Sequence, residues 1–208
     1  MRALPLFLVP AVVAAQAPAP LPEAPLSAGE REQAQRLLAE SRQALLKATD
    51  GLTPAQWTFK PAPDRWSIQE CAQHIALVEQ VIQSQVIAKG LAGPREPLRR
   101  ADVTFTDAFL IAALPDRSHR FQAPERLRPA GGTATPEAVL GAFEATRKLL
   151  DADVKASAAD WRARFGVHPA LGTLDLYQWV LLAAGHTTRH VQQIEEVKRA
   201  PGFPAASR

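Results

Sequence analysis

The sequence predicts an all-α protein, a four-helix bundle with a long, loop-rich crossover between the second and third helices. Three observations support this fold class. Four segments carry apolar residues at helical spacing, each after a recognisable helix-start signal. Alternating strand patterns are scarce, and residues 91–134 hold too many prolines and glycines for a long helix.

The first two helices begin at capping boxes. Ser27-Ala-Gly-Glu30 starts a helix that we expect to end near Gly51, and Ser67-Ile-Gln-Glu70 starts one that should stop by Gly90. A single helical turn is expected between them, after Thr53. The inner face predicted for the second helix holds Cys71, His74, Val78, Val81, Gln85 and Ala88.

Residues 91–134 form the predicted crossover. Five prolines and the Gly131-Gly132 pair interrupt it, and only residues 108–114 suit a short helix. Long connections inside compact domains are uncommon and often functional. We therefore expect this segment to cover one end of the bundle.

The third and fourth helices follow the crossover. Thr135-Pro-Glu137 predicts a helix start with Val139, Phe143, Thr146 and Leu150 on its inner face. A short turn is expected at 157–161, and Gly172-Thr173 should open the last helix. The inner face predicted for that helix holds Leu176, Trp179, Ala183, His186, His190, Gln193 and Val197.

The first 17 residues have the pattern of a secretory signal peptide. Arg2 precedes an apolar run at 3–13, and small residues follow at 14–17. We expect cleavage after Ala15 or Ala17 and a periplasmic or secreted protein. The run is shorter than the roughly 20 residues of a spanning helix, so we expect no membrane span in the mature protein.

The expected domain organisation follows from these segments. Residues 1–17 are the signal peptide, and the proline-rich residues 18–26 form an extended linker. Residues 27–200 form the bundle, and 201–208 form a disordered tail.

Composition excludes several function classes. The formal net charge is only +3 and no basic run is interleaved with aromatic residues, so we expect no nucleic-acid partner. The single cysteine, Cys71, allows neither an intramolecular disulfide nor a thiolate cluster. The sequence has no nucleophile elbow, phosphate-binding glycine loop or Cys-x-x-Cys pair.

Three histidines form the strongest candidate site. His186 and His190 are four residues apart, so on a helix both lie on one face and can reach one metal ion. His74 lies on the inner face of another predicted helix and can supply a third ligand. Three histidine ligands would leave a coordination position open, as in catalytic zinc sites. The alternative for each is a hydrogen-bonded core histidine.

Other polar residues near these histidines have two interpretations each. Gln193 could orient a ligand or be a polar residue at the bundle end, and Glu70 could accept a proton or only complete its capping box. His119 and His168 lie in loop-like segments outside the helical faces. Either could still approach the open end of the site as a fourth ligand.

The chain resembles the DinB/YfiT-like family of metal-binding four-helix bundles. The resemblance rests on Trp66-Ser-Ile-Gln-Glu-Cys-Ala-Gln-His74, on the segment from His168 to Trp179, and on His186-Thr-Thr-Arg-His190-Val-Gln-Gln-Ile194. It spans roughly residues 27–200, in the family's order of helices. It implies that His74, His186 and His190 bind a divalent ion, zinc or nickel, and that the protein forms a homodimer.

The family includes thiol transferases, thiol-dependent isomerases and proteins labelled as hydrolases, most of them cytoplasmic. An export signal departs from that pattern and weakens the transferase interpretation, because reduced thiols are scarce outside the cytoplasm. Our leading hypothesis is an exported metal-dependent hydrolase or transferase that activates a water or thiol for an unknown small-molecule substrate. The alternatives are a non-catalytic metal-binding or sensing bundle and a structural interaction module.

Overall fold

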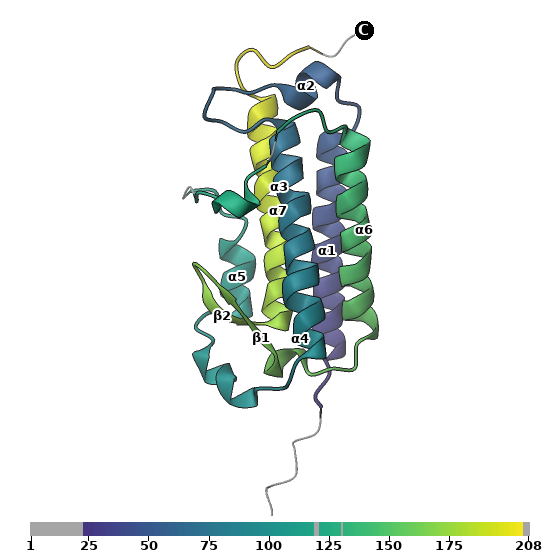
Figure 1. Cartoon of the computed structure of the whole chain (residues 1–208), viewed down its shortest axis with the longest axis vertical. Coiled ribbons are helices and arrows are strands. Elements are labelled where there is room, and N and C mark those ends of the chain that lie inside the picture. The colour runs from purple at the N-terminus through teal and green to yellow at the C-terminus, as the bar shows by residue number, and fades with distance from the viewer. Residues whose placement is uncertain (1–22, 119–120, 130, 206–208) are drawn as a thin grey trace, which may run out of the picture.

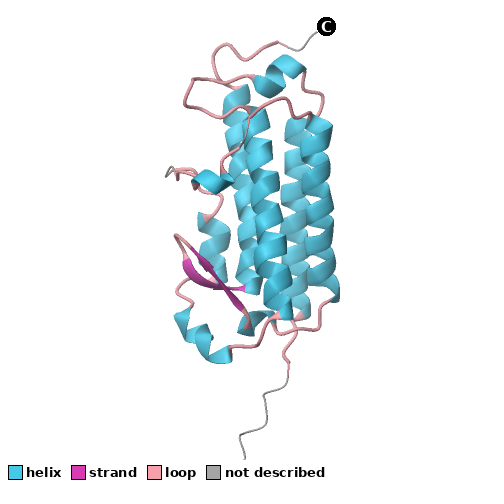
Figure 2. Cartoon of the chain, in the orientation of Figure 1, coloured by secondary structure: helices cyan, strands magenta, loops and turns pink. Residues whose placement is uncertain are grey.

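The computed structural model describes residues 23–118, 121–129 and 131–205. Four long helices make up the bundle, as predicted (Figures 1 and 2). They are α1 (Ala28–Thr49), α3 (Ile68–Val81), α6 (Pro136–Ala156) and α7 (Leu176–Lys198). Beyond α3, a π-helical segment (Ile82–Ile87) and α4 (Ala88–Ala92) continue the second helix slightly past its expected end.

The direction of the helices explains the long crossover. Each of α1 and α3 packs against both α6 and α7. In Figure 1, α1 and α7 run upward and α3 and α6 run downward. Because α3 and α6 are parallel neighbours, the chain between them must return along the whole bundle before α6 can begin.

Short elements cover one end and one side of the bundle. The single-turn helix α2 (Pro54–Thr58) lies at the top of Figure 1. The crossover contains α5 (Asp107–Ala113), which confirms the short helix expected there, and two 3-10 helices, Pro97–Asp102 and Glu125–Leu127. Another 3-10 helix, Trp161–Ala163, follows α6.

The start of the fourth helix was predicted wrongly. Residues from Gly172 form a strand, β2 (Gly172–Asp175), which pairs antiparallel with β1 (Phe165–His168). Gly172 adopts a positive φ of 70°, which suits glycine at the turn of this hairpin. The last helix begins after Asp175, whose Oδ1 accepts a hydrogen bond from Gln178 N at 2.8 Å.

The predicted helix starts are otherwise confirmed. Side-chain oxygens accept from the backbone N–H three residues later at Ser27 (3.2 Å), Thr53 (3.2 Å), Ser67 (3.1 Å) and Thr135 (3.3 Å). At the first three of these positions the capping box is complete.

The inner faces differ from the prediction at two places. Beyond Val78, the second helix buries Ile82 and Ile87, while Gln85 and Ala88 are exposed. A π turn takes more residues than an α turn, so it rotates the residues that follow out of the predicted stripe. In α6, Arg147 is buried where Thr146 was expected.

Arg147 makes hydrogen bonds to residues of the other three long helices. Its guanidinium forms a bidentate ion pair with Glu79 of α3, and both side chains are at most 3% exposed. It also donates to Ser41 Oγ of α1 at 2.9 Å and to Thr187 Oγ1 of α7 at 3.1 Å. Each guanidinium nitrogen of Arg147 therefore donates to an acceptor within one buried hydrogen-bond network.

The ends of the bundle are only partly described. Residues 1–22 lie outside the described residues, as do 206–208, so the predicted signal peptide is among those not described. Two residues of the predicted linker reach the bundle, because Leu26 is buried and Glu23 accepts from Asp160 N at 2.6 Å. Residues 201–205 differ from the expected disordered tail. Phe203 packs edge-on against Phe59, and Gln56 donates to Pro204 O at 2.9 Å.

Among the described residues, no helix is both long and apolar enough to cross a membrane.

We expect Arg147→Met to lower the free energy of unfolding by about 3–5 kcal/mol, because it leaves Glu79 buried without its partner. Urea unfolding followed by circular dichroism would measure this change. The double variant Arg147→Met/Glu79→Leu should recover much of the loss, since neither charge then remains buried. A single variant as stable as the parent would contradict a central role for this pair.

Candidate metal centre

Three histidines from two helices meet on one side of the bundle. Their ligand atoms lie within 4.8 Å of one another, and no other group of this kind occurs among the described residues. His74 comes from α3, and His186 and His190 come from α7. His74 and His190 are buried, whereas His186 is partly exposed. The centre is therefore enclosed but reachable from solvent.

Helix geometry accounts for this meeting. One turn of α7 separates His186 and His190, and their ring centroids are 4.5 Å apart. Because α3 packs alongside α7, His74 lies 4.9 Å from the ring of His186 and 4.7 Å from that of His190. The structure thus brings together the three residues that the sequence proposed as ligands.

The crossover determines which nitrogen of His74 carries the proton. His74 Nδ1 lies 2.6 Å from the carbonyl oxygen of Leu127, in the 3-10 helix of the crossover. A carbonyl oxygen can only accept, so Nδ1 must donate. In the neutral ring Nε2 then carries a lone pair, and it faces His186 Nε2 at 3.1 Å.

This donor set fits a metal ion. The 3.1 Å contact between His74 Nε2 and His186 Nε2 is a hydrogen bond when Nε2 of His186 carries its proton, and a metal ion that displaces this proton would be bound by both nitrogens. Tetrahedral ligation at the usual zinc–nitrogen distance places two nitrogens about 3.3 Å apart. The His74–His186 separation is close to that spacing, and all three ligand atoms lie within 4.8 Å of one another, so side-chain shifts would bring them around one ion.

Gln193 orients the third ring. Its Oε1 lies 3.0 Å from His190 Nδ1, which leaves Nε2 of His190 for the centre. Ligating histidines commonly donate their other N–H to a neighbouring acceptor. The structure therefore places Gln193 where the ligand-orienting interpretation requires it.

Burial keeps the three imidazoles neutral. Desolvation lowers the pKa of His74 and lowers that of His186 well below its ordinary value, with His190 and His74 as further causes for His186. Burial, with a smaller effect from His74, lowers the pKa of His190 to about 3. Neutral imidazole is the form that binds metals.

Sequence reasoning missed three residues around the centre. The indole of Trp66 stacks on His190 with centroids 5.8 Å apart and contacts His74 at 4.9 Å. Arg117 of the crossover donates to Gln193 Oε1 at 3.3 Å and pairs with Glu196, which the sequence analysis did not connect with the site. Glu196 lies one helical turn after Gln193, a spacing that could have indicated a shared partner. No sequence signal places Arg117 there.

Glu70 has structural contacts. Its Oε2 accepts from Ser67 N at 2.8 Å, completing the capping box, and both carboxylate oxygens pair with Lys60 Nζ at 2.8 and 2.9 Å. These bonds correspond to the capping interpretation of Glu70.

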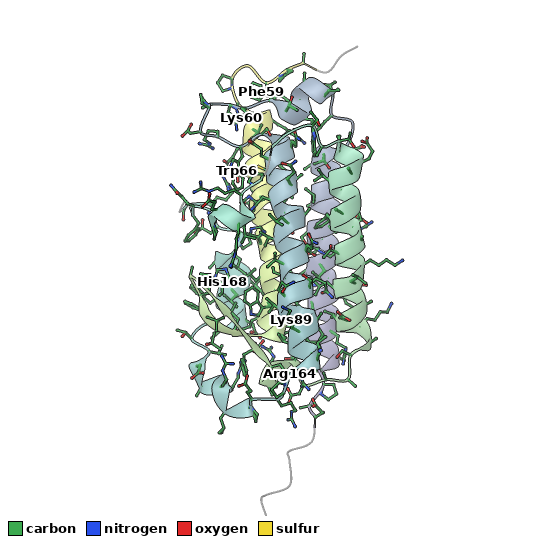
Figure 3. The ribbon with its side chains drawn as sticks, in the orientation of Figure 1. Phe59, Lys60, Trp66, Lys89, Arg164 and His168 are labelled. Carbon is green, nitrogen blue, oxygen red and sulfur yellow. The ribbon has the colours of Figure 1, made fainter. Side chains whose placement is uncertain are left out.

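His168 and His119 are not in the cluster of described ligands. His168 Nδ1 accepts from Ala170 N and Leu171 N, both at 3.2 Å, and thereby closes the turn between β1 and β2. Figure 3 shows His168 and Trp66 on the side of the bundle that carries the hairpin. His119 lies outside the described residues.

Comparison with known proteins identifies the family. The solved structure of YfiT from Bacillus subtilis, described as a probable metal-dependent hydrolase with an unusual four-helix bundle topology, matches with a TM-score of 0.56 at 16% identity. The match covers 88% of this chain and 94% of YfiT. The uncharacterized protein YuaE of Bacillus subtilis (strain 168) is 23% identical over 159 residues, 76% of this chain and 93% of YuaE. The family model of the DinB superfamily matches residues 37–194, and this chain belongs to that superfamily.

Proposed function

We propose that the chain binds one divalent metal ion through His74, His186 and His190 and acts as a metal-dependent hydrolase. The observation that carries this proposal is the convergence of three neutral imidazoles, two of which face each other through Nε2 at 3.1 Å. The fold shared with YfiT, a probable metal-dependent hydrolase, supports the same interpretation.

Zinc or nickel is the proposed ion. An all-imidazole donor set suits both, whereas magnesium and calcium prefer oxygen ligands. When bound, such an ion with three protein ligands would keep a coordination position open and lower the pKa of a water or thiol bound there.

The protein supplies the surroundings for this chemistry. Leu127 O and Gln193 Oε1 hold two of the rings, those of His74 and His190, in position, and the indole of Trp66 packs against both. The partly exposed edge at His186 is the proposed entrance for a small-molecule substrate. A thiol transferase is the second form of the proposal, and export would weaken it because reduced thiols are scarce outside the cytoplasm.

We also propose that the protein is exported and forms a homodimer. Export is supported by the pattern of residues 1–17, with its basic start, apolar run and small residues. The dimer rests on resemblance to the family alone.

Elemental analysis of the purified, untagged protein is the decisive experiment. We expect about one zinc, nickel or similar ion per chain in the parent and none in His190→Ala, because two imidazoles bind a divalent ion weakly. The helix content of the variant should persist, since the core apart from this ring is unchanged. His168→Ala is the matched control and should retain its metal. Metal-free parent protein after controlled loading would leave a structural bundle and end the enzyme hypothesis.

Metal addition should also stabilise the folded chain. An ion that binds only the native state at a hundredfold excess over its Kd adds about 2.7 kcal/mol to the free energy of unfolding. We expect zinc to raise the Tm of metal-free parent protein and to leave that of His190→Ala unchanged. An equal rise in both would place the binding site elsewhere.

N-terminal sequencing of exported protein tests the signal peptide. We expect the mature chain to begin at Gln16 or Pro18, after cleavage at the small residues that follow the apolar run. Exported protein that still begins with Met1 would contradict cleavage.

A further inference from the structure

A chain of hydrogen bonds leads from His190 into the crossover. Gln193 Oε1 lies 3.0 Å from His190 Nδ1 and 3.3 Å from a terminal guanidinium nitrogen of Arg117. Arg117 also donates two hydrogen bonds to the carboxylate of Glu196, of 2.7 and 2.8 Å. The crossover is thus connected to a proposed ligand of α7 through a side chain.

The donors and acceptors of these hydrogen bonds permit only one placement of the His190 proton. Arginine has five N–H donors and no acceptor, so the atom of Gln193 that faces Arg117 must be the amide oxygen. That oxygen can only accept, and therefore His190 Nδ1 must carry the proton. A neutral imidazole has a single N–H, so Nε2 is left with the lone pair that a metal requires.

Glu196 fixes Arg117 in the position that this arrangement needs. The bidentate pairing of a guanidinium with a carboxylate is strong and strongly oriented. Arg65 lies 3.6 Å from the same carboxylate and makes no bond to Gln193. The side chain of Arg117 is only 19% exposed, so the pair is partly shielded from solvent.

We propose that Arg117 is a positioning residue that holds the amide of Gln193 and thereby locks His190 in the tautomer with its proton on Nδ1. We call this arrangement the tautomer lock. The inference rests on the proposed function, because metal binding is the reason for keeping the lone pair on His190 Nε2. Together with Leu127 O on His74, it makes the crossover responsible for the tautomers of two of the three rings.

Loss of Arg117 would free the amide to turn over. The two ends of a glutamine amide are nearly equal in size, so nothing steric would prevent its NH₂ from facing His190. Nδ1 would then accept, the proton would move to Nε2, and the ring would present an N–H where the ion needs a lone pair.

Tautomer measurement in the metal-free protein tests the lock directly. Long-range ¹H–¹⁵N NMR should show His190 protonated only at Nδ1 in the parent. Arg117→Ala should show a mixture of tautomers or protonation at Nε2. A parent-like spectrum of folded Arg117→Ala would overturn the proposal.

Zinc affinity, measured by competition with a chelator, gives the second readout. We expect Arg117→Ala to weaken binding by about 10–100-fold, the usual effect of removing a group that orients a ligand. In the Gln193→Glu background the same change should cost much less, because a carboxylate accepts from His190 in either orientation. Equal losses in the two backgrounds would show that Arg117 does not act through the amide, and would also overturn the lock.

Arg65→Ala is the matched control. It removes an arginine beside Glu196 but leaves the bonds of Arg117, so affinity should stay within about threefold of the parent, as for other partly exposed ion pairs. A loss as large as that of Arg117→Ala would assign the effect to charge alone and contradict the lock. Failure of the lock and failure of the proposed function are separable. A locked His190 without zinc binding refutes only the function, and zinc binding with a freely exchanging tautomer refutes only the lock.

Discussion

The buried ion pair of Arg147 and Glu79 is the constraint on which the rest of the structure depends. Removing either partner would leave an unpaired charge in the core. The helices must therefore pack at axial positions that keep the two side chains paired. The same guanidinium binds Thr187, which lies next to His186, and Glu79 follows His74 on α3. The network therefore sets the level of α3 against α7, and with it the meeting of the three histidines.

The Arg147 network and the histidine centre, both buried in the bundle, differ in what their polar atoms can still bind. In the Arg147 network the donors of a buried charge find acceptors on three helices, and such a network gains nothing from another ligand. In the histidine centre, burial holds the rings neutral while Nε2 of His74 and Nε2 of His186 face each other. Neutral imidazole nitrogens gathered at one point are suited to bind a metal ion that displaces the proton between His74 and His186.

The bundle and the crossover have different tasks at this centre. The helices supply the three imidazole rings. His186 and His190, one turn apart on α7, lie opposite His74 on α3. The crossover supplies Leu127 O and Arg117, whose bonds decide how two of the rings are protonated. A parallel arrangement of α3 and α6 obliges the chain to travel back along the bundle (Figure 1). Leu127 and Arg117 of this returning segment contact His74 and Gln193.

The sequence by itself determined what depends on local spacing. The capping boxes at Ser27 and Ser67, the four long helices and the pairing of His186 with His190 all follow from periods that a helix imposes. The strand at Gly172 pairs with residues 165–168, which are close in the sequence, and the sequence analysis wrongly assigned it to the start of the last helix. The π turn after α3 and the burial of Arg147 were decided by packing between distant segments, which leaves no periodic signal in the chain. The same holds for Arg117. Its place beside Gln193 depends on the path of an irregular segment, and only the tertiary structure determines that path, because each of its bonds joins residues far apart in sequence.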